Sequence, residues 1–396
     1  MPSLSFRYHL ISVPIDLDSF TSSLLYSYIR STHPPAKSFS PVYIPLLNLP
    51  RDRIPLRPEF SLVCEQAGIK PTNLITLDDL SVDVLSSSTT HWLLVDHNRL
   101  TGQLRAVPQE KVVGVIDHHD DEQFVPHVSD PQPRIIEKAG SCTSLVVGFC
   151  RSSWDAISST SLTAGAAHGQ GESAINDGAF TQIWDAQTAK LAMSSILIDT
   201  ANLTAPGRVE QIDRDAVAYL EAKINLSPKD AKSWDRQQFY DQVKEAKADI
   251  GGLTLPDILE KDYKQWNEGN LILGISSVVK DLAFLVGKSE SATFLQSLDS
   301  FMQKKGLTIF AIMTTSTSET GVFQRQLLLQ AKASAVKQIE AFLLKVEELK
   351  LEEIEFDNID HQSDMRTTDM WRKAWWQKEI RISRKQVAPM LREAMQ

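Results

Sequence analysis

The 396-residue sequence has no long hydrophobic run and few cysteines. No window approaches the roughly 18 consecutive apolar residues of a membrane-spanning helix, so we expect no association with a membrane. The three cysteines form no CxxC pair and no even set, which argues against a disulfide-built domain and a zinc finger. The first twenty residues carry too short an apolar stretch for a signal peptide and reach acidic residues early. We therefore expect a cytoplasmic protein.

The sequence also has fewer basic than acidic residues. Lysine and arginine total 41 against 50 for aspartate and glutamate, which gives a net charge of −9. This balance argues against a protein that coats nucleic acid or an anionic membrane, although a local basic pocket is compatible with it. Hydrophobic residues make up 42% and charged residues 23%, as in an ordinary globular protein. The length allows two domains, and we expect a monomer that binds no nucleic acid.

The first half of the chain alternates short apolar runs with helical patterns, which is typical of βαβ units and a mainly parallel sheet. We expect strands at residues 6–12, 40–48, 91–98 and 111–119. We expect helices at residues 17–31, 140–154 and 181–203, the second of them beginning at Gly140 and Ser141. Residues 158–180 are rich in Ser, Ala and Gly without apolar periodicity, so we interpret them as a flexible surface insertion.

The second half has a different pattern. A long amphipathic helical stretch covers residues 333–354, and strand-like runs occupy residues 270–279 and 307–315. This combination predicts a second α/β domain, with the join between residues 215 and 240. We therefore divide the chain into residues 1–220 and residues 235–396.

Acidic and imidazole side chains follow several of the apolar segments. They lie in the stretches "PIDLDSF" (Asp16, Asp18), "LLVDHN" (Asp96, His97), "VVGVIDHHDDEQF" (Asp117, His118, His119) and "SSILIDTANL" (Asp199). Open α/β sheets bind their ligands at the carboxyl ends of the strands, where these side chains can meet. Taken singly, each acid has a simpler explanation, such as capping the helix that follows.

The mixture of carboxylate oxygen and imidazole nitrogen suits Mn²⁺, Co²⁺ or Mg²⁺ better than a structural zinc ion. Carboxylates that cluster without cations repel one another and raise one another's pKa, and divalent metals remove that cost. Two metals roughly 3.5–4 Å apart are a standard device for hydrolysing phosphoanhydrides and phosphoesters. The pattern therefore predicts a metal-dependent hydrolase.

The order of these motifs resembles that of the DHH phosphoesterase superfamily: D-x-D-S at Asp16–Ser19, D-H-N at Asp96–Asn98, D-H-H at Asp117–His119, and a later lone Asp199. D-x-K at Asp262–Lys264 and S-R-K at Ser383–Lys385 are similar to phosphate-binding motifs of a C-terminal domain. That domain is shared by family II inorganic pyrophosphatases, fungal exopolyphosphatases and prune-type proteins. The stretches "NLPRDRIPLRPEF" and "GSCTSLVV" resemble the exopolyphosphatase and prune branch. The absence of a Gly-Gly-Gly-His signature argues against a RecJ-like exonuclease.

The resemblance implies an N-terminal DHH domain with a mainly parallel sheet flanked by helices. It also implies a smaller C-terminal α/β domain and an active site in the cleft between the two. Two divalent cations, Mn²⁺ or Mg²⁺ and alternatively Co²⁺, would be bound by Asp16, Asp18, Asp96, His118 and Asp199. Asp96 would bridge the two cations, with Asp16 on one and the other three ligands on the second. The catalytic residues implied are His119, Asp96 and Asp117. The substrate-binding residues implied are His97, His119, Lys264, Arg384 and Lys385, with His97 alternatively in a supporting position behind the ligands.

The resemblance further implies an exopolyphosphatase that releases terminal orthophosphate from inorganic polyphosphate, or acts on another short phosphoanhydride, by attack of a metal-activated hydroxide. The alternatives are an inorganic pyrophosphatase, a prune-like phosphodiesterase and a non-catalytic phosphate-binding relative. The last alternative arises from Ser12. The family places a histidine or an asparagine four residues before the aspartate equivalent to Asp16, and a serine hydroxyl is a weaker metal ligand than either.

Overall fold

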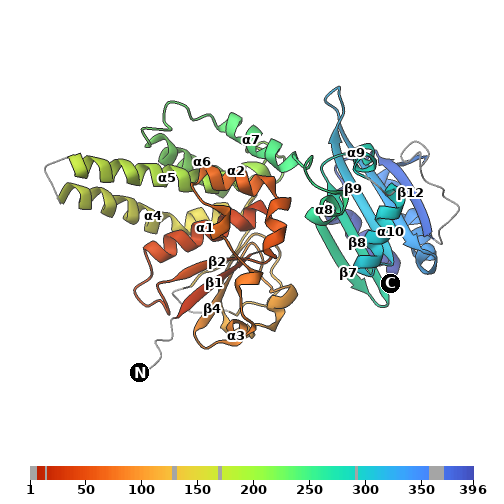
Figure 1. The fold of residues 1–396 in the computed structure, drawn as a ribbon, viewed down its shortest axis with the longest axis horizontal. Helices are drawn as coiled ribbons and strands as arrows, with labels where there is room; N and C mark the ends of the chain where they lie inside the picture. Colours follow the sequence, from red (N-terminus) through yellow and green to blue (C-terminus); the bar gives the residue numbers. More distant parts are fainter. Residues whose placement is uncertain (1–6, 14–15, 127–131, 168–171, 290–292, 356–369) are drawn as a thin grey trace. The chain divides into compact units, whose positions relative to one another are not determined.

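The chain forms two compact α/β units, Met1–Lys247 (unit 1) and Ala248–Gln396 (unit 2) (Figure 1). The computed structural model describes residues 7–13, 16–126, 132–167, 172–289, 293–355 and 370–396. The division falls later than the join expected at residues 215–240, because Phe239 and Val243 pack in the core of unit 1. Among the described residues, no helix is both long enough and apolar enough to cross a membrane.

Unit 1 contains a six-stranded parallel sheet, as predicted. Its strands are β1 (Tyr8–Val13), β2 (Tyr43–Leu47), β3 (Ile75–Thr76), β4 (Thr90–Val95), β5 (Val112–Asp117) and β6 (Arg134–Ile136). They lie in the order β3-β2-β1-β4-β5-β6, and every neighbouring pair is parallel. The four strands expected from the sequence are confirmed. β3 and β6 are too short to give a periodic signal.

Helices enclose both faces of this sheet. The larger core lies under α1 (Leu17–Thr32), α2 (Pro58–Gln66), α4 (Cys142–Ala167), α5 (Glu172–Asp199), α6 (Gln211–Asn225) and α7 (Arg236–Ala248). The second core, around Trp92, Leu10 and Leu46, is covered by α3 (Val82–Ser86) and short 3₁₀ turns. The predicted helices after β1, at residues 140–154 and at residues 181–203 are confirmed by α1, α4 and α5, although α4 begins at Cys142 and α5 ends at Asp199.

Helical structure extends into the segment that we interpreted as an insertion. α4 continues to Ala167 and α5 begins at Glu172, so residues 158–167 and 172–180 are helical. Alanine is the best helix former, and the Ala-rich composition favours a helix even without an apolar stripe. Residues 168–171 lie outside the described residues. α4 and α5 run side by side (Figure 1), and Asp185 links them by accepting from Trp154 Nε1 at 2.8 Å.

Unit 2 contains a second six-stranded sheet, which is mostly antiparallel. Its strands are β7 (Tyr263–Glu268), β8 (Leu271–Val278), β9 (Ile309–Thr317), β10 (Phe323–Lys332), β11 (Leu351–Ile354) and β12 (Met370–Gln377). They lie in the order β11-β12-β10-β9-β8-β7, with β8 and β9 parallel. One face carries α8 (Leu255–Lys261), α9 (Leu282–Gly287) and α10 (Phe294–Lys305). The other face carries α11 (Val336–Lys345) and α12 (Arg384–Met395).

The single long helix predicted for residues 333–354 is wrong. α11 ends at Lys345, and a short 3₁₀ turn leads to Lys350, whose φ of 50° is left-handed. The chain then forms β11, in which Glu353 pairs with Lys373 of β12 at 2.9 Å and Glu352 pairs with Lys378, the residue after β12, at 2.7 Å. The acids therefore belong to an edge strand with cross-strand ion pairs. No glycine or proline marks the break, so periodicity alone did not reveal it.

His9 of β1 is a buried imidazole that lies away from the acidic motifs. It is fully buried, stacks on Tyr43 with 4.3 Å between ring centroids, and has the Gln132 amide nitrogen 3.4 Å from its Nε2. Its Nδ1 has no hydrogen-bond partner within the described part of the chain. Burial, followed by the charge of His91, lowers the pKa of His9 to about 4.

Acid should therefore destabilise the protein through His9. The unfolded histidine takes up a proton near pH 6.5, whereas the folded one does so only near pH 4. Neutral, buried His9 therefore contributes to the free energy of unfolding above pH 6.5. This contribution is lost as the pH falls toward 4, which lowers the free energy of unfolding by up to about 3 kcal/mol. Urea unfolding at pH 7 and pH 4.5 measures this loss, and His9→Gln should reduce it. His33→Gln, at an exposed histidine, is the control. Equal pH dependence of stability in His9→Gln and wild type would show that His9 is not the cause of the loss in acid.

Candidate metal centre

The acidic motifs of unit 1 meet at one edge of its sheet. Asp96 follows the last residue of β4, and Asp117 is the last residue of β5. Asp16 and Asp18 lie at the start of α1, which follows β1. Because β1, β4 and β5 are parallel neighbours, their carboxyl ends bring these side chains together, as the sequence predicted. Asp96 has a φ of 64°, a left-handed conformation that aspartate tolerates better than most residues.

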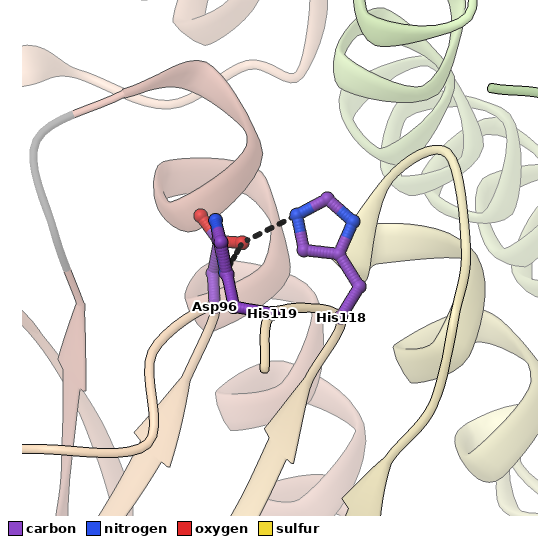
Figure 2. A group of neighbouring side chains, drawn as sticks. All are labelled: Asp96, His118 and His119. Carbon is purple, nitrogen blue, oxygen red and sulfur yellow. Dashed lines mark ion pairs between the residues drawn. The ribbon is translucent and has the colours of Figure 1, made fainter. Parts of the chain in front are cut away.

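Asp96, His118 and His119 form a potential metal-binding group. Their ligand atoms all lie within 4.8 Å of one another, and Figure 2 shows the three side chains converging. Asp96 Oδ1 lies 3.2 Å from His118 Nε2 and 3.9 Å from His119 Nδ1. His118 Nδ1 donates to the carbonyl of Ala139 at 2.9 Å. That hydrogen bond directs Nε2 toward the carboxylates, as in many metal-binding histidines.

Asp117 orients the two histidines. It is fully buried, and its Oδ1 accepts from the backbone N–H groups of His118 at 2.8 Å and His119 at 3.2 Å. The same oxygen accepts from His119 Nδ1 at 2.8 Å, and Oδ2 accepts from the Asn98 amide at 2.6 Å. Burial alone would raise the pKa of Asp117, but the bonds from His119 and Asn98 outweigh it and lower the pKa. The His119 side chain is 51% exposed and so remains open to a ligand.

Asp18 is held by the start of α4. Its carboxylate accepts from the Ser141 hydroxyl at 2.6 Å, from Cys142 N at 2.6 Å, and from Thr143 N and Oγ1 at 2.9 and 2.7 Å. Its Oδ2 also lies 3.9 Å from His118 Nε2. The sequence predicts a helix that begins at Gly140 and Ser141, but it does not predict the contacts of Ser141, Cys142 and Thr143 with Asp18. The donors lie more than 120 residues away in sequence, and no local signal could have identified them.

Asp16 and Asp199 complete the predicted ligand set. Asp16 caps α1 by accepting from Ser19 N at 2.9 Å, and the Ser19 hydroxyl donates to Asp16 and also contacts Asp96. Asp199 is the last residue of α5, and its Oδ2 is buried without a hydrogen-bond partner in the described residues. Asp16 and Asp199 are not part of the close group formed by Asp96, His118 and His119.

The electrostatics of the cluster favour a cation. Burial, reinforced by the charges of Asp16 and Asp18, raises the pKa of Asp96 well above its usual range. Burial and the charge of Asp18 also raise the pKa of Asp199. Burial would lower the pKa of His118, but its contact with Asp96 and the charge of Asp18 raise it to about 10. Asp199 Oδ2 is buried without a hydrogen-bond partner among the described residues, and buried Asp96 Oδ1 has only its ion-pair contacts with His118 and His119. A divalent cation would compensate them, and the donors suit Mn²⁺ or Mg²⁺.

His97 lies behind this group, next to Ser12. His97 Nδ1 donates to the carbonyl of Val95 at 3.0 Å, so Nε2 is left as an acceptor facing the Ser12 hydroxyl at 3.5 Å. Ser12 is fully buried in β1. Burial lowers the pKa of His97, which favours its neutral form. The sequence left two roles open for His97, substrate binding and a supporting position behind the metal ligands. The observed position is compatible with the supporting role.

In unit 2 the two basic motifs come together. Arg384 begins α12, and its guanidinium donates to the backbone carbonyl of Asp262 at 2.7 Å and pairs with Asp262 Oδ1 at 2.8 Å. Lys264 lies in β7 and Lys385 follows Arg384, and both are exposed. The D-x-K and S-R-K motifs, 122 residues apart in sequence, are thus in direct contact. Phosphate binding by Lys264, Arg384 and Lys385 stays a prediction.

Comparisons with known proteins agree with this arrangement. Residues 241–394 match the DHHA2 domain family. The chain is 30% identical over 382 residues to a Schizosaccharomyces pombe protein named "Putative exopolyphosphatase", covering 96% of this chain and 88% of that protein. It is 28% identical to the human "Exopolyphosphatase PRUNE1", covering 76% of this chain and 57% of the human protein.

Among solved structures, a Methanococcus jannaschii protein described as a "putative family II inorganic pyrophosphatase" shares the fold. Its TM-score is 0.55 at 16% identity, over 98% of this chain and 99% of that one. The sequence relatives, the DHHA2 match and the motif order point to the same group. The chain belongs to the exopolyphosphatase-like family of the DHH phosphoesterase superfamily.

Proposed function

We propose that the protein is a divalent-metal-dependent phosphoanhydride hydrolase that releases terminal orthophosphate from inorganic polyphosphate. The observation that carries the proposal is the group of buried Asp96 with His118 and the exposed His119 at the carboxyl edge of a parallel sheet. The relatives from Schizosaccharomyces pombe and human, both named as exopolyphosphatases, support the choice of substrate.

In this proposal two divalent cations would be held by five residues, Asp16, Asp18, Asp96, His118 and Asp199. When bound, they would activate water and neutralise phosphate charge. Asp117 holds His119 by its Nδ1, and when the ring is an imidazolium Nε2 carries the second proton and would donate it to a phosphate or leaving oxygen. Lys264, Arg384 and Lys385 would bind phosphate groups of the chain, Arg384 through two oxygens and the lysines as mobile charges.

A substrate panel tests the proposal. Orthophosphate release is measured from long-chain polyphosphate, pyrophosphate and a cyclic nucleotide, each with Mn²⁺, with Mg²⁺ and with EDTA. Metal-dependent release from polyphosphate above the other two supports an exopolyphosphatase. Preference for pyrophosphate or for the cyclic nucleotide would instead identify a pyrophosphatase or a prune-like phosphodiesterase. Phosphate binding without any hydrolysis would identify a non-catalytic relative.

Because of Ser12, one of the two cations should bind more weakly than the other. A hydroxyl is a poorer ligand than an imidazole or an amide, so activity plotted against Mn²⁺ concentration should rise in two phases. Ser12→Asn supplies an amide oxygen and suits the buried position better than a larger imidazole beside His97. We expect it to shift the weaker phase to about tenfold lower Mn²⁺, whereas Ser12→Ala should follow wild type. Identical curves for Ser12→Asn and wild type would place Ser12 outside the metal site.

A further inference from the structure

The segment Ala139–Thr143, which we call the turn, comprises the three residues before α4 and the first two residues of α4, and two buried carboxylates bind it. One is Asp18, which accepts from Cys142 N at 2.6 Å and Thr143 N at 2.9 Å. The other is Asp213, near the start of α6, which the sequence analysis did not single out. Asp213 is connected to the metal centre through this turn, because the turn binds both Asp213 and Asp18.

Asp213 is fully buried and accepts four hydrogen bonds. Its Oδ2 accepts from Gly140 N and from Glu210 N, both at 2.8 Å. Its Oδ1 accepts from the Ser144 hydroxyl at 2.6 Å and from Ser141 N at 3.3 Å. Three of these four donors belong to the turn or to the first residues of α4. One carboxylate thus fixes the entry of the chain into α4 against the start of α6.

Gly140 shows how closely the turn is packed. A Cβ at this position would lie 2.6 Å from Thr200 Cγ2 and 2.7 Å from both Arg208 O and Asp213 Oδ2. Two of those three contacts are with backbone or a branched side chain, which cannot move aside easily. The turn is therefore seated against Asp213 on one side and against Thr200, the neighbour of Asp199, on the other.

The same turn contacts predicted ligands of one cation. The carbonyl of Ala139 accepts from His118 Nδ1 at 2.9 Å and sets the direction of that imidazole. The N–H groups of Cys142 and Thr143 hold the Asp18 carboxylate. A shift of the turn would therefore move Asp18 and His118 together. A misplacement of this kind weakens metal binding, as changes behind metal ligands commonly do.

We infer that Asp213 is a positioning residue for the cation site formed by Asp18, His118 and Asp199. It acts through the turn Ala139–Thr143 and touches neither the cation nor the substrate. The inference rests on the proposed function for the metal-binding role of those three residues. Its structural part, that Asp213 immobilises the turn, does not depend on a metal.

Asp213→Asn tests both parts. The new amide group must face two of the four donors, so at least one backbone N–H loses its acceptor. With EDTA present, hydrogen–deuterium exchange of peptides spanning residues 140–146 should become about tenfold faster. The amides of Cys142 and Thr143 bond to Asp18 and not to Asp213, so their exchange reports on the turn. If the variant does not fold, Ser144→Ala removes a single donor and is measured instead.

Mn²⁺ binding provides the second readout. We expect one of the two Mn²⁺ dissociation constants to rise about tenfold while the other stays unchanged. The matched control is Asp230→Asn, which removes a buried aspartate bonded to Lys190 at 2.6 Å in the same unit. Asp230→Asn should lower the Tm without changing Mn²⁺ binding or exchange at the turn. A destabilised Asp213→Asn with wild-type exchange or wild-type Mn²⁺ affinity would overturn the inference. A wild type that binds no Mn²⁺ would overturn the proposed function, and this role of Asp213 with it.

Discussion

Asp96→Ala is expected to lower kcat more than ~10³-fold, because both cations would lose a shared ligand. Asp96 directly follows β4, its Oδ1 lies 3.2 Å from His118 Nε2, and its side chain is buried. No other carboxylate in the close group could replace it, since the remaining two members are histidines. Mn²⁺ stoichiometry should fall together with activity. The measurement is steady-state hydrolysis of polyphosphate together with Mn²⁺ binding at equilibrium.

Two further variants make this result interpretable. Asp96→Asn keeps the size of the side chain and tolerates the φ of 64°, which strains alanine. It removes a carboxylate whose pKa is raised by burial and by Asp16, so the Tm in EDTA should be unchanged or higher. Asp120→Ala, an exposed carboxylate beside the D-H-H motif, is the control and should retain activity. Near-normal turnover in folded Asp96→Ala would refute the bridging assignment.

Arg384→Ala should lower kcat/KM for polyphosphate about 10²–10³-fold, the size of effect seen when one charged or dipolar donor to a reacting group is removed. Two N–H groups of Arg384 are occupied by Asp262. A guanidinium has five, so three are not used by that pair. The Asp262 contact fixes the guanidinium in one orientation, which favours binding of a phosphate through two oxygens. Mn²⁺ stoichiometry should stay at the wild-type value.

Arg381→Ala is the matched control for this prediction. Arg381 lies three residues before Arg384, is 86% exposed and pairs with Glu379 at 2.7 Å. Its removal takes the same charge from the same segment but should leave kcat/KM within about twofold of wild type, as exposed ion pairs contribute little. Equal losses in both variants would indicate a general charge effect. Loss of bound Mn²⁺ in Arg384→Ala would show that the residue is structural.

The sequence by itself determined the parallel sheet and the chemistry at its edge. β1, β4 and β5 are short apolar runs, and each is followed closely by an aspartate or by Asp-His-His. Strand signals are local, and parallel strands necessarily place their carboxyl ends at one edge. The convergence of Asp96, His118 and His119 could therefore be predicted without coordinates. The order of the motifs also predicted the family, and the sequence relatives confirm it.

The tertiary structure alone decided what holds these side chains in place. The donors to Asp18 come from residues 123 to 125 positions away, and Asp262 meets Arg384 across 122 positions. Such contacts depend on how helices pack after folding, and they leave no periodic signal in either segment. Asp213 is the clearest example of a residue whose role could not be predicted from the sequence, because a single aspartate at the start of a helix predicts only a helix cap. The end of α11 at Lys345 escaped prediction for a related reason: tertiary pairing of β11 with β12 overrode a continuous helical pattern.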